Sequence, residues 1–263
     1  MLKKYLLSIF ICCFIFQVSS SQEITGIATY KSFMKFDVEL DSMQVPKELQ
    51  ADLLKAIKQQ TQKEYELHFS STESVFKEKE QLAQPSANFM SGAMVSSTGG
   101  FGVSYKNLKE NRYVTQRDLL GKLFLISDTL KNQEWSLEKE TKNIGDYTCF
   151  KATRVRTSED TETGETIETP ITAWYTPQIP IATGPFTYDG LPGLILEITD
   201  GKSTYLCSQV VLNPKNGVKI EQPKKGKKVS NEEFEEIQAK KMKEMRENAP
   251  VGDGNSIEFT IQN

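Results

Sequence analysis

Short β-type segments joined by short, turn-forming connections fill most of the chain from residue 64 to residue 212. The clearest pair is 194–198 and 204–212, because the Asp200-Gly201 between them is a strong signal for a type I′ hairpin turn. Parallel strands need long crossover connections, so short connections favour antiparallel pairing. We therefore expect an α+β fold built on one large twisted, mainly antiparallel β-sheet, with a half-barrel as one form of it.

Two helices are expected to be added to this sheet. Pro46 can open the first, because its missing N–H costs nothing there, and an apolar face continues to about Gln62. The second spans residues 230–248, where Ser230 and Glu233 have the spacing of a capping box. The remaining expected strands are residues 22–39, 64–70, 74–80, those within 105–129, 144–155, 171–176 and 257–261.

The first 21 residues have the pattern of a cleavable signal peptide. Lys3 and Lys4 form a basic start, an apolar run follows from Tyr5 to Val18, and three serines precede Gln22. The run is too short to span a bilayer comfortably, although a short membrane anchor stays open as an alternative. We expect a periplasmic or secreted protein whose mature part, residues 22–263, is a single β-rich domain without a transmembrane segment.

The charge balance argues against a nucleic-acid partner. Without Lys3 and Lys4 the chain has 30 basic and 35 acidic residues, a mild and mixed excess of negative charge. Lys224, Lys225, Lys227 and Lys228 lie within one short segment, residues 223–228, and could touch an anionic surface. A solvated linker is the preferred interpretation of that segment.

Two cysteines remain after the signal peptide, Cys149 and Cys207. In an oxidising compartment an isolated pair is most simply a disulfide, so we expect this bridge. Two buried thiols are the alternative, because pairing requires a geometry that the sequence does not give.

Residues 81–105 contain no charged side chain and several glycines, which argues against regular structure there. Long loops of this kind are insertions, binding loops or lids. We expect a flexible loop, with a mobile apolar flap over a ligand as the alternative.

The chain offers few residues for catalysis or metal binding. Its only histidine, His68, is out of phase with Leu67 and Phe69 on a predicted strand, and we expect it to be exposed. A catalytic triad or a zinc site therefore lacks its usual residues. The acidic residues of 159–168 are expected to form a solvated hairpin tip, and no cofactor or metal is expected.

One segment resembles a known family. Its marks are Trp135, the run Ile144-Gly145 with Tyr147, Cys149 and Lys151-Ala152, then Trp174-Tyr175, Ile179-Pro180, Gly184-Pro185 and Gly190-Leu191-Pro192-Gly193-Leu194-Ile195. This pattern is similar to that of the GLPGLI family, exported proteins typical of Bacteroidetes and without an assigned activity. The resemblance implies export rather than chemistry. A weaker fold-level similarity is to periplasmic lipoprotein carriers, which hold acyl chains in a curved half-barrel.

The residues of this segment are also the candidate ligand or partner contacts: Trp174, Tyr175, Gly184, Pro185, Gly190, Leu191, Pro192 and Gly193. The preferred structural interpretation of the hexapeptide is a rigid turn that positions the next strand. We expect a non-enzymatic binding or interaction module for an apolar small molecule or for an outer-membrane or envelope protein. A structural protein without a ligand, and a hydrolase using carboxylates such as Asp189 and Glu197, are the alternatives.

Overall fold

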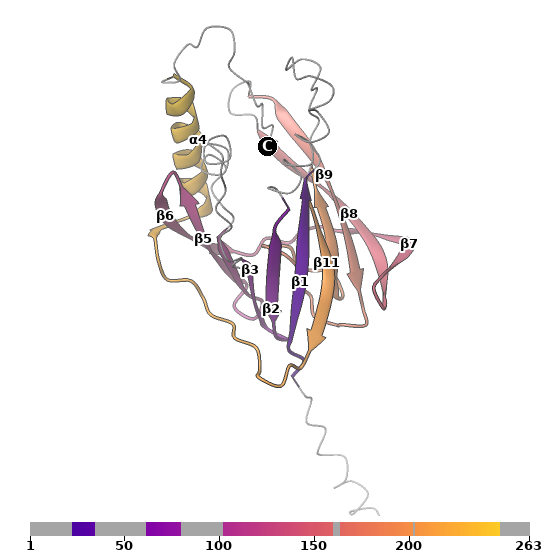
Figure 1. Cartoon of the computed structure of the whole chain (residues 1–263). Coiled ribbons are helices and arrows are strands. Elements are labelled where there is room, and N and C mark those ends of the chain that lie inside the picture. Colours follow the sequence, from indigo (N-terminus) through magenta and orange to yellow (C-terminus); the bar gives the residue numbers. More distant parts are fainter. Residues whose placement is uncertain (1–22, 35–61, 80–101, 160–163, 202, 248–263) are drawn as a thin grey trace, which may run out of the picture.

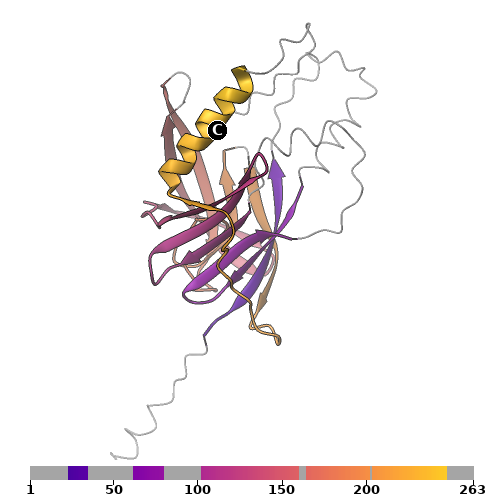
Figure 2. The same cartoon turned by 90° about the vertical axis from the view of Figure 1, so that its left-hand side faces the viewer.

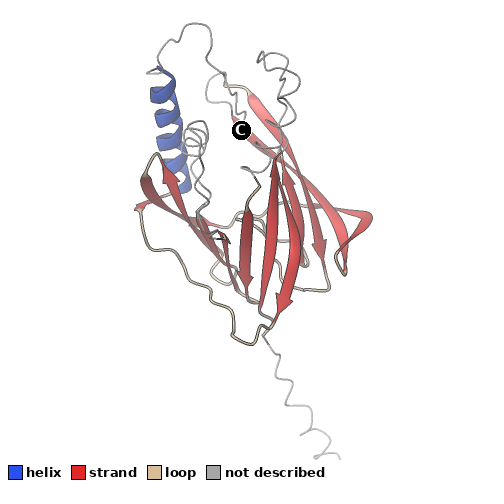
Figure 3. Ribbon diagram, in the orientation of Figure 1, coloured by secondary structure: helices blue, strands red, loops and turns tan. Residues whose placement is uncertain are grey.

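The computed structural model describes residues 23–34, 62–79, 102–159, 164–201 and 203–247. Within these residues twelve strands form one sheet, and one helix is added to it (Figure 3). The strands are β1 (Gly26–Met34), β2 (Glu64–Phe69), β3 (Glu73–Glu78), β4 (Val103–Asn107), β5 (Arg112–Leu119), β6 (Lys122–Thr129), β7 (Ser136–Ile144), β8 (Tyr147–Glu159), β9 (Thr166–Thr176), β10 (Leu194–Asp200), β11 (Ser203–Leu212) and β12 (Lys227–Val229); the helix is α4 (Asn231–Glu247).

The sheet is strongly curved and not closed (Figure 1). Its order is β12-β6-β5-β4-β3-β2-β1-β11-β10-β9-β8-β7, so β12 and β7 are the two edges. All neighbours are antiparallel except β12 and β6, which are parallel. The expected α+β fold with a large, mainly antiparallel sheet is therefore confirmed.

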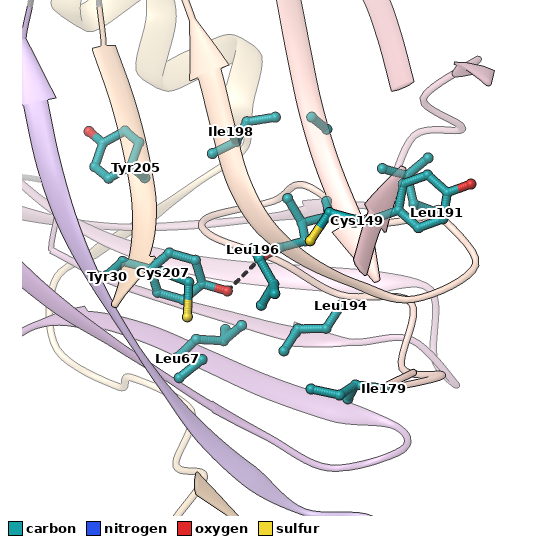
Figure 4. Close-up of a cluster of buried hydrophobic side chains, with 14 of the residues drawn as sticks. Tyr30, Leu67, Cys149, Ile179, Leu191, Leu194, Leu196, Ile198, Tyr205 and Cys207 are labelled. Atoms are coloured by element: carbon teal, nitrogen blue, oxygen red, sulfur yellow. Dashed lines mark hydrogen bonds between the residues drawn. The ribbon is translucent and has the colours of Figure 1, made fainter. Parts of the chain in front are cut away.

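Most of the core lies on one face of the sheet, which we call the inner face. Strand register places Tyr30, Leu67 and Phe76 on it from one half of the sheet, and Ala173 and Ile198 from the other. All five are almost fully buried. The Tyr30 hydroxyl donates a hydrogen bond of 2.7 Å to the backbone carbonyl oxygen of Ile195, which satisfies a polar group inside this cluster (Figure 4).

Helix α4 covers the inner face near the β12 edge (Figure 2). Phe234 packs against Phe124 and Ile126 of β6, and its ring lies edge-on to that of Phe124 at 5.4 Å. The predicted capping box is present: the Ser230 Oγ accepts from the Glu233 N–H at 3.1 Å, and the Glu233 carboxylate accepts from the Ser230 N–H at 2.8 Å. Within the described ranges no helix has the length and apolar character of a membrane span.

The segment of residues 213–226, which we call the strap, connects β11 with β12 across the other, outer face (Figure 1). Ile220 packs on the small outer cluster of Tyr105, Val114 and Leu125. The Lys219 carbonyl oxygen lies 3.0 Å from Nδ1 of His68. Because the strap covers its strand, His68 is buried, and the expectation of an exposed histidine is wrong.

Several boundaries differ from the sequence-based expectation. Strand β4 begins at Val103, so the last residues of the expected loop 81–105 are strand, while residues 81–101 lie outside the described residues. The expected strand 144–155 instead begins after a two-residue turn at Gly145, whose φ of +56° favours glycine. An additional edge strand, β7, precedes that turn, and β12 replaces the end of the expected linker 223–228.

Four further expectations concern residues that the structure does not describe. They are the signal peptide 1–21, the helix from Pro46, the flap interpretation of residues 81–101 and the strand 257–261. These remain predictions.

Candidate functional site

The loop between β9 and β10, residues 177–193, folds against the inner face of the sheet, and we call it the inner loop. Its hydroxyl Thr183 Oγ1 lies 3.0 Å from Ser74 Oγ of β3. Its Phe186 ring contacts three aromatic rings from the sheet, with centroid distances of 4.6 Å to Phe76, 4.8 Å to Tyr205 and 6.3 Å to Tyr65. The inner loop therefore joins the two halves of the curved sheet through packing.

The hexapeptide 190–195 ends the inner loop as a rigid turn. Leu191 is almost fully buried, and the Leu194 N–H donates to the Ile179 carbonyl oxygen at 3.0 Å. At Gly193 a Cβ atom would lie 2.1 Å from the carbonyl oxygen of Thr176. Only glycine fits such a close backbone approach, so this residue is required by packing. Gly190 and Pro192 are exposed at the same turn.

A buried lysine holds the inner loop from the opposite side. The Lys106 side chain projects from β4 onto the inner face, and its Nζ donates to the carbonyl oxygens of Gly184 at 3.0 Å and Tyr188 at 2.5 Å. Burial lowers the pKa of Lys106 to about 8, and the Asp189 carboxylate acts in the opposite direction. The cation thus fixes two loop carbonyls at the cost of its own hydration.

Asp189 connects the inner loop to the start of β7. Its Oδ1 accepts from Gln133 Nε2 at 3.2 Å, and its backbone carbonyl oxygen accepts from Trp135 Nε1 at 2.9 Å. Its Oδ2 is buried without a hydrogen-bond partner among the described residues. Burial raises the pKa of Asp189, while Lys106, Gln133 and Arg154 lower it. The carboxyl group therefore serves as a structural anchor.

An open pocket of about 450 Å³ lies beside this network. Its lining combines amides, hydroxyls, one cation and short apolar groups: Asn132, Gln133, Glu134, Ser136, Thr153, Arg154, Val155, Pro170, Ile171 and Thr172. Arg154 donates from Nη1 to Gln133 Oε1 at 3.2 Å, and its guanidinium lies 5.7 Å from the centre of the Trp135 ring. One side of the pocket is therefore held rigidly by the inner-loop network.

The pocket coincides with a change in strand pairing. Strand β8 pairs with β7 only as far as Thr153, whereas its pairing with β9 continues to Glu159. Among the described residues, Arg154 to Glu159 therefore has a neighbour on one side only. We call this segment the β8 edge. Val155 lies in it with 56% of its surface exposed.

A protein-family model matches the region just described. Residues 135–170 and 160–197 match the model of a family described as "Protein of unknown function (Porph_ging)". The match is to a family without a known function. It spans β7 to the middle of β10 and includes the inner loop, so the resemblance covers this part of the chain and not the whole.

Two solved structures show a weak structural similarity to this chain. They are entitled "Structure of PNGF-II in P21 space group" and "Structure of PNGF-II in C2 space group", with 17% identity and a TM-score of 0.47 in both cases. They cover 81% and 82% of this chain, which spans about a third, 33% and 32%, of their own length. The expected similarity to periplasmic lipoprotein carriers stays a prediction. No curated protein matches the chain significantly.

The structure separates the candidate contacts predicted from the hexapeptide segment. Gly184, Pro185, Leu191 and Gly193 are buried in the inner loop. Tyr175 faces the core, where it contacts Phe150. They therefore act in packing rather than as one exposed surface.

Trp174 lies on the outer face of the sheet, whereas the next residue in β9, Tyr175, faces the inner side. The Lys142 Nζ lies 4.3 Å from the centre of its ring and also 2.6 Å from Glu197 Oε2. Asp189 is held on the inner side by Lys106 and Gln133, so Asp189 and Glu197 do not converge as a catalytic pair.

The predicted disulfide is not formed, because Cys149 and Cys207 are both free, buried thiols (Figure 4). The first lies in β8 and the second in β11, with β10 and β9 between them. A disulfide needs Cα atoms roughly 4.4–6.8 Å apart, a separation that neighbouring strands provide, whereas these two cysteines lie on strands that are not neighbours. Burial raises the pKa of Cys149 to about 11 and that of Cys207 to about 12.

Sequence reasoning missed Lys106, Gln133 and Arg154. No local pattern identifies Lys106, since its two acceptors lie 78 and 82 residues further along the chain. The β8 edge was equally hidden, because it depends on where the unpredicted strand β7 begins.

Proposed function

We propose that this protein is an exported, non-enzymatic interaction module that binds an extended segment of an outer-membrane or envelope protein along the β8 edge. The observation that carries the proposal is the open pocket beside a strand segment that has, among the described residues, a neighbour on one side only. An antiparallel strand directs alternate N–H and C=O groups to each side, so a free side offers a template for one more strand. Export rests on the signal-peptide pattern and on the resemblance to the GLPGLI family.

The pocket supplies the side-chain contacts that strand addition needs for specificity. Its cation, Arg154, is already oriented by Gln133, and it can bind a carboxylate or carbonyl group of the added segment. Val155 and Pro170 offer a small apolar surface beside it. A strand next to β8 would therefore gain main-chain hydrogen bonds along the edge and one selective contact at its end.

Other occupants and activities are less well supported. An apolar small molecule would need room on the inner face, where Phe186 packs against Phe76 and Tyr205 from the two halves of the sheet. A carboxylate hydrolase would need two converging acids, and Asp189 and Glu197 face opposite sides.

Peptide selection tests the proposal. Random peptides of about ten residues, which match an edge of this length, would be selected on the purified protein, and binding would be measured by fluorescence anisotropy. Val155→Asp and Arg154→Gln are expected to weaken binding at least roughly tenfold, since each removes one contact of about 1.5 kcal/mol. Lys139→Gln, an exposed change on β7, is the matched control.

Amide hydrogen exchange gives the decisive signature. Bound peptide is expected to slow exchange at alternate amides between Arg154 and Glu159, because these N–H groups become hydrogen-bonded. Protection confined to other strands, or peptides that bind the Val155→Asp variant as well as the wild type, would refute the proposed site.

A further inference from the structure

The turn between β5 and β6 leaves apolar side chains partly exposed. Leu120 and Gly121 form it, with φ values of +53° and +78°. A two-residue hairpin turn with positive φ at both positions prefers asparagine or glycine, and leucine is strained there. Leu120 and Leu123 are each 38% exposed, and neither belongs to a described core cluster.

Five lysines lie on the same part of the sheet as these leucines. Lys227 and Lys228 of β12 pair in register with Phe124 and Leu125 of β6, the residues that follow Leu123. Lys224 and Lys225 precede them at the end of the strap, and Lys122 follows the turn. All five lysines are exposed.

The close approach of the strap fixes this arrangement. A Cβ atom at Gly226 would lie 2.7 Å from the carbonyl carbon of Phe124, so the backbone that carries the lysines touches the backbone of β6. The lysines at 224, 225, 227 and 228 make no ion pair with any described carboxylate.

The nearby acids are engaged elsewhere. Asp118 Oδ1 accepts from the Gly121 N–H at 2.9 Å, Glu233 accepts from the Ser230 N–H, and Glu235 accepts from Asn231 Nδ2 at 2.6 Å. Because the four lysines form no ion pair among the described residues, their ammonium groups can contact a partner.

We propose that the β5–β6 turn and β12 together dock on an anionic lipid surface. Exposed leucines at a hairpin tip can enter the boundary between headgroups and acyl chains, and adjacent lysines attract anionic headgroups. A soluble polyanion would use the lysines alone and would gain nothing from Leu120 and Leu123. The docking site is separate from the β8 edge and does not depend on the peptide-binding proposal.

Vesicle sedimentation tests the lipid proposal with the full chain. The probes are vesicles of phosphatidylcholine alone and vesicles of three parts phosphatidylcholine to one part phosphatidylglycerol. The wild type is expected to bind only the second kind, and to be released when NaCl is raised to about 0.5 M, where the Debye length is roughly 4 Å. Lys227→Gln with Lys228→Gln is expected to lower the partition coefficient roughly 25-fold, about fivefold for each lysine.

Leu120→Asn separates a lipid surface from a soluble polyanion. Asparagine suits a positive φ, so this variant should fold at least as well as the wild type, as its melting temperature would show. It is expected to bind the anionic vesicles roughly fivefold more weakly, which is the loss of part of one leucine side chain. Lys131→Gln with Lys139→Gln, remote exposed lysines, is the control that should bind normally.

Three results would overturn the proposal. They are equal binding to both kinds of vesicle, unchanged binding by the Lys227→Gln, Lys228→Gln variant, and unchanged binding by Leu120→Asn. The last result combined with displacement by soluble polyphosphate would assign the lysines to a polyanion instead.

Discussion

Replacing Lys106 by methionine should destabilise the protein by an amount that grows with pH. Methionine keeps the apolar stem but leaves the carbonyl oxygens of Gly184 and Tyr188 without their donor. Each buried carbonyl left unpaired costs about 1–3 kcal/mol. This loss applies at every pH, because a neutral amine can still donate to both oxygens in the wild type.

The wild type carries an opposing cost that disappears as pH rises. The pKa of Lys106 is about 8 in the folded state against 10.5 for an unburied lysine. Between these values the unfolded chain binds more protons than the folded one, so the free energy of unfolding of the wild type rises with pH. Between pH 7 and pH 10 this gain is about 2–3 kcal/mol, from about 1.4 kcal/mol per pH unit. The methionine variant lacks it.

Urea unfolding near pH 7 and near pH 10 measures the effect. The stability gap between wild type and Lys106→Met should widen by about 2–3 kcal/mol at the higher pH. Tyrosine titration affects both proteins equally and cancels in the gap. Lys139→Met, a change at an exposed site, should have nearly the same free energy of unfolding as the wild type at both pH values. A gap that stays constant or narrows would show that Asp189, rather than burial, governs the charge of Lys106.

Three further experiments test other parts of the structure. Gly193→Ala should lower the free energy of unfolding in urea by more than about 2 kcal/mol, because its Cβ would overlap a backbone carbonyl. Gly217→Ala, which has open space around it, should lower it by about 1 kcal/mol. Equal losses for the two variants would argue against the close approach at Gly193. Cys149 and Cys207 should react with a maleimide only after unfolding, since burial raises both pKa values; a mass two units below the reduced value would instead reveal a bridge. Ser230→Ala should lower stability by about 1 kcal/mol and Ser230→Thr by less, measured by thermal unfolding; identical melting temperatures would mean that the cap is not formed.

The sequence predicted those elements whose determinants are local. The hairpin at Asp200-Gly201 and the cap at Ser230 depend on residues within a few positions of each other, and both are confirmed. The large antiparallel sheet followed from the short connections. Strand β7 was missed because it is an edge strand that is polar along nearly its whole length, so alternation gave no signal.

The candidate site was less predictable because its parts come together only in the tertiary structure. The hexapeptide was correctly interpreted as a rigid turn, yet the pocket lies on β8 and on residues before β7, beyond that motif. The disulfide expectation was wrong because the sequence shows that two cysteines are present but not which strands are neighbours in the sheet. Two strands lie between Cys149 and Cys207, and that order depends on the whole topology.

The position of β1 determines the order in which the sheet can be completed. Strands β2 to β6 are neighbours in sequence order, as are β7 to β11, so each group can form from local contacts. In the described sheet β1 is the strand that pairs with both groups, and its Gly26 pairs with Leu212, which is 186 residues later. Such long-range pairing has a high entropic cost of loop closure and is slow. β1, which is synthesised before the other described strands, therefore keeps one edge unpaired until almost all of this sheet has been made.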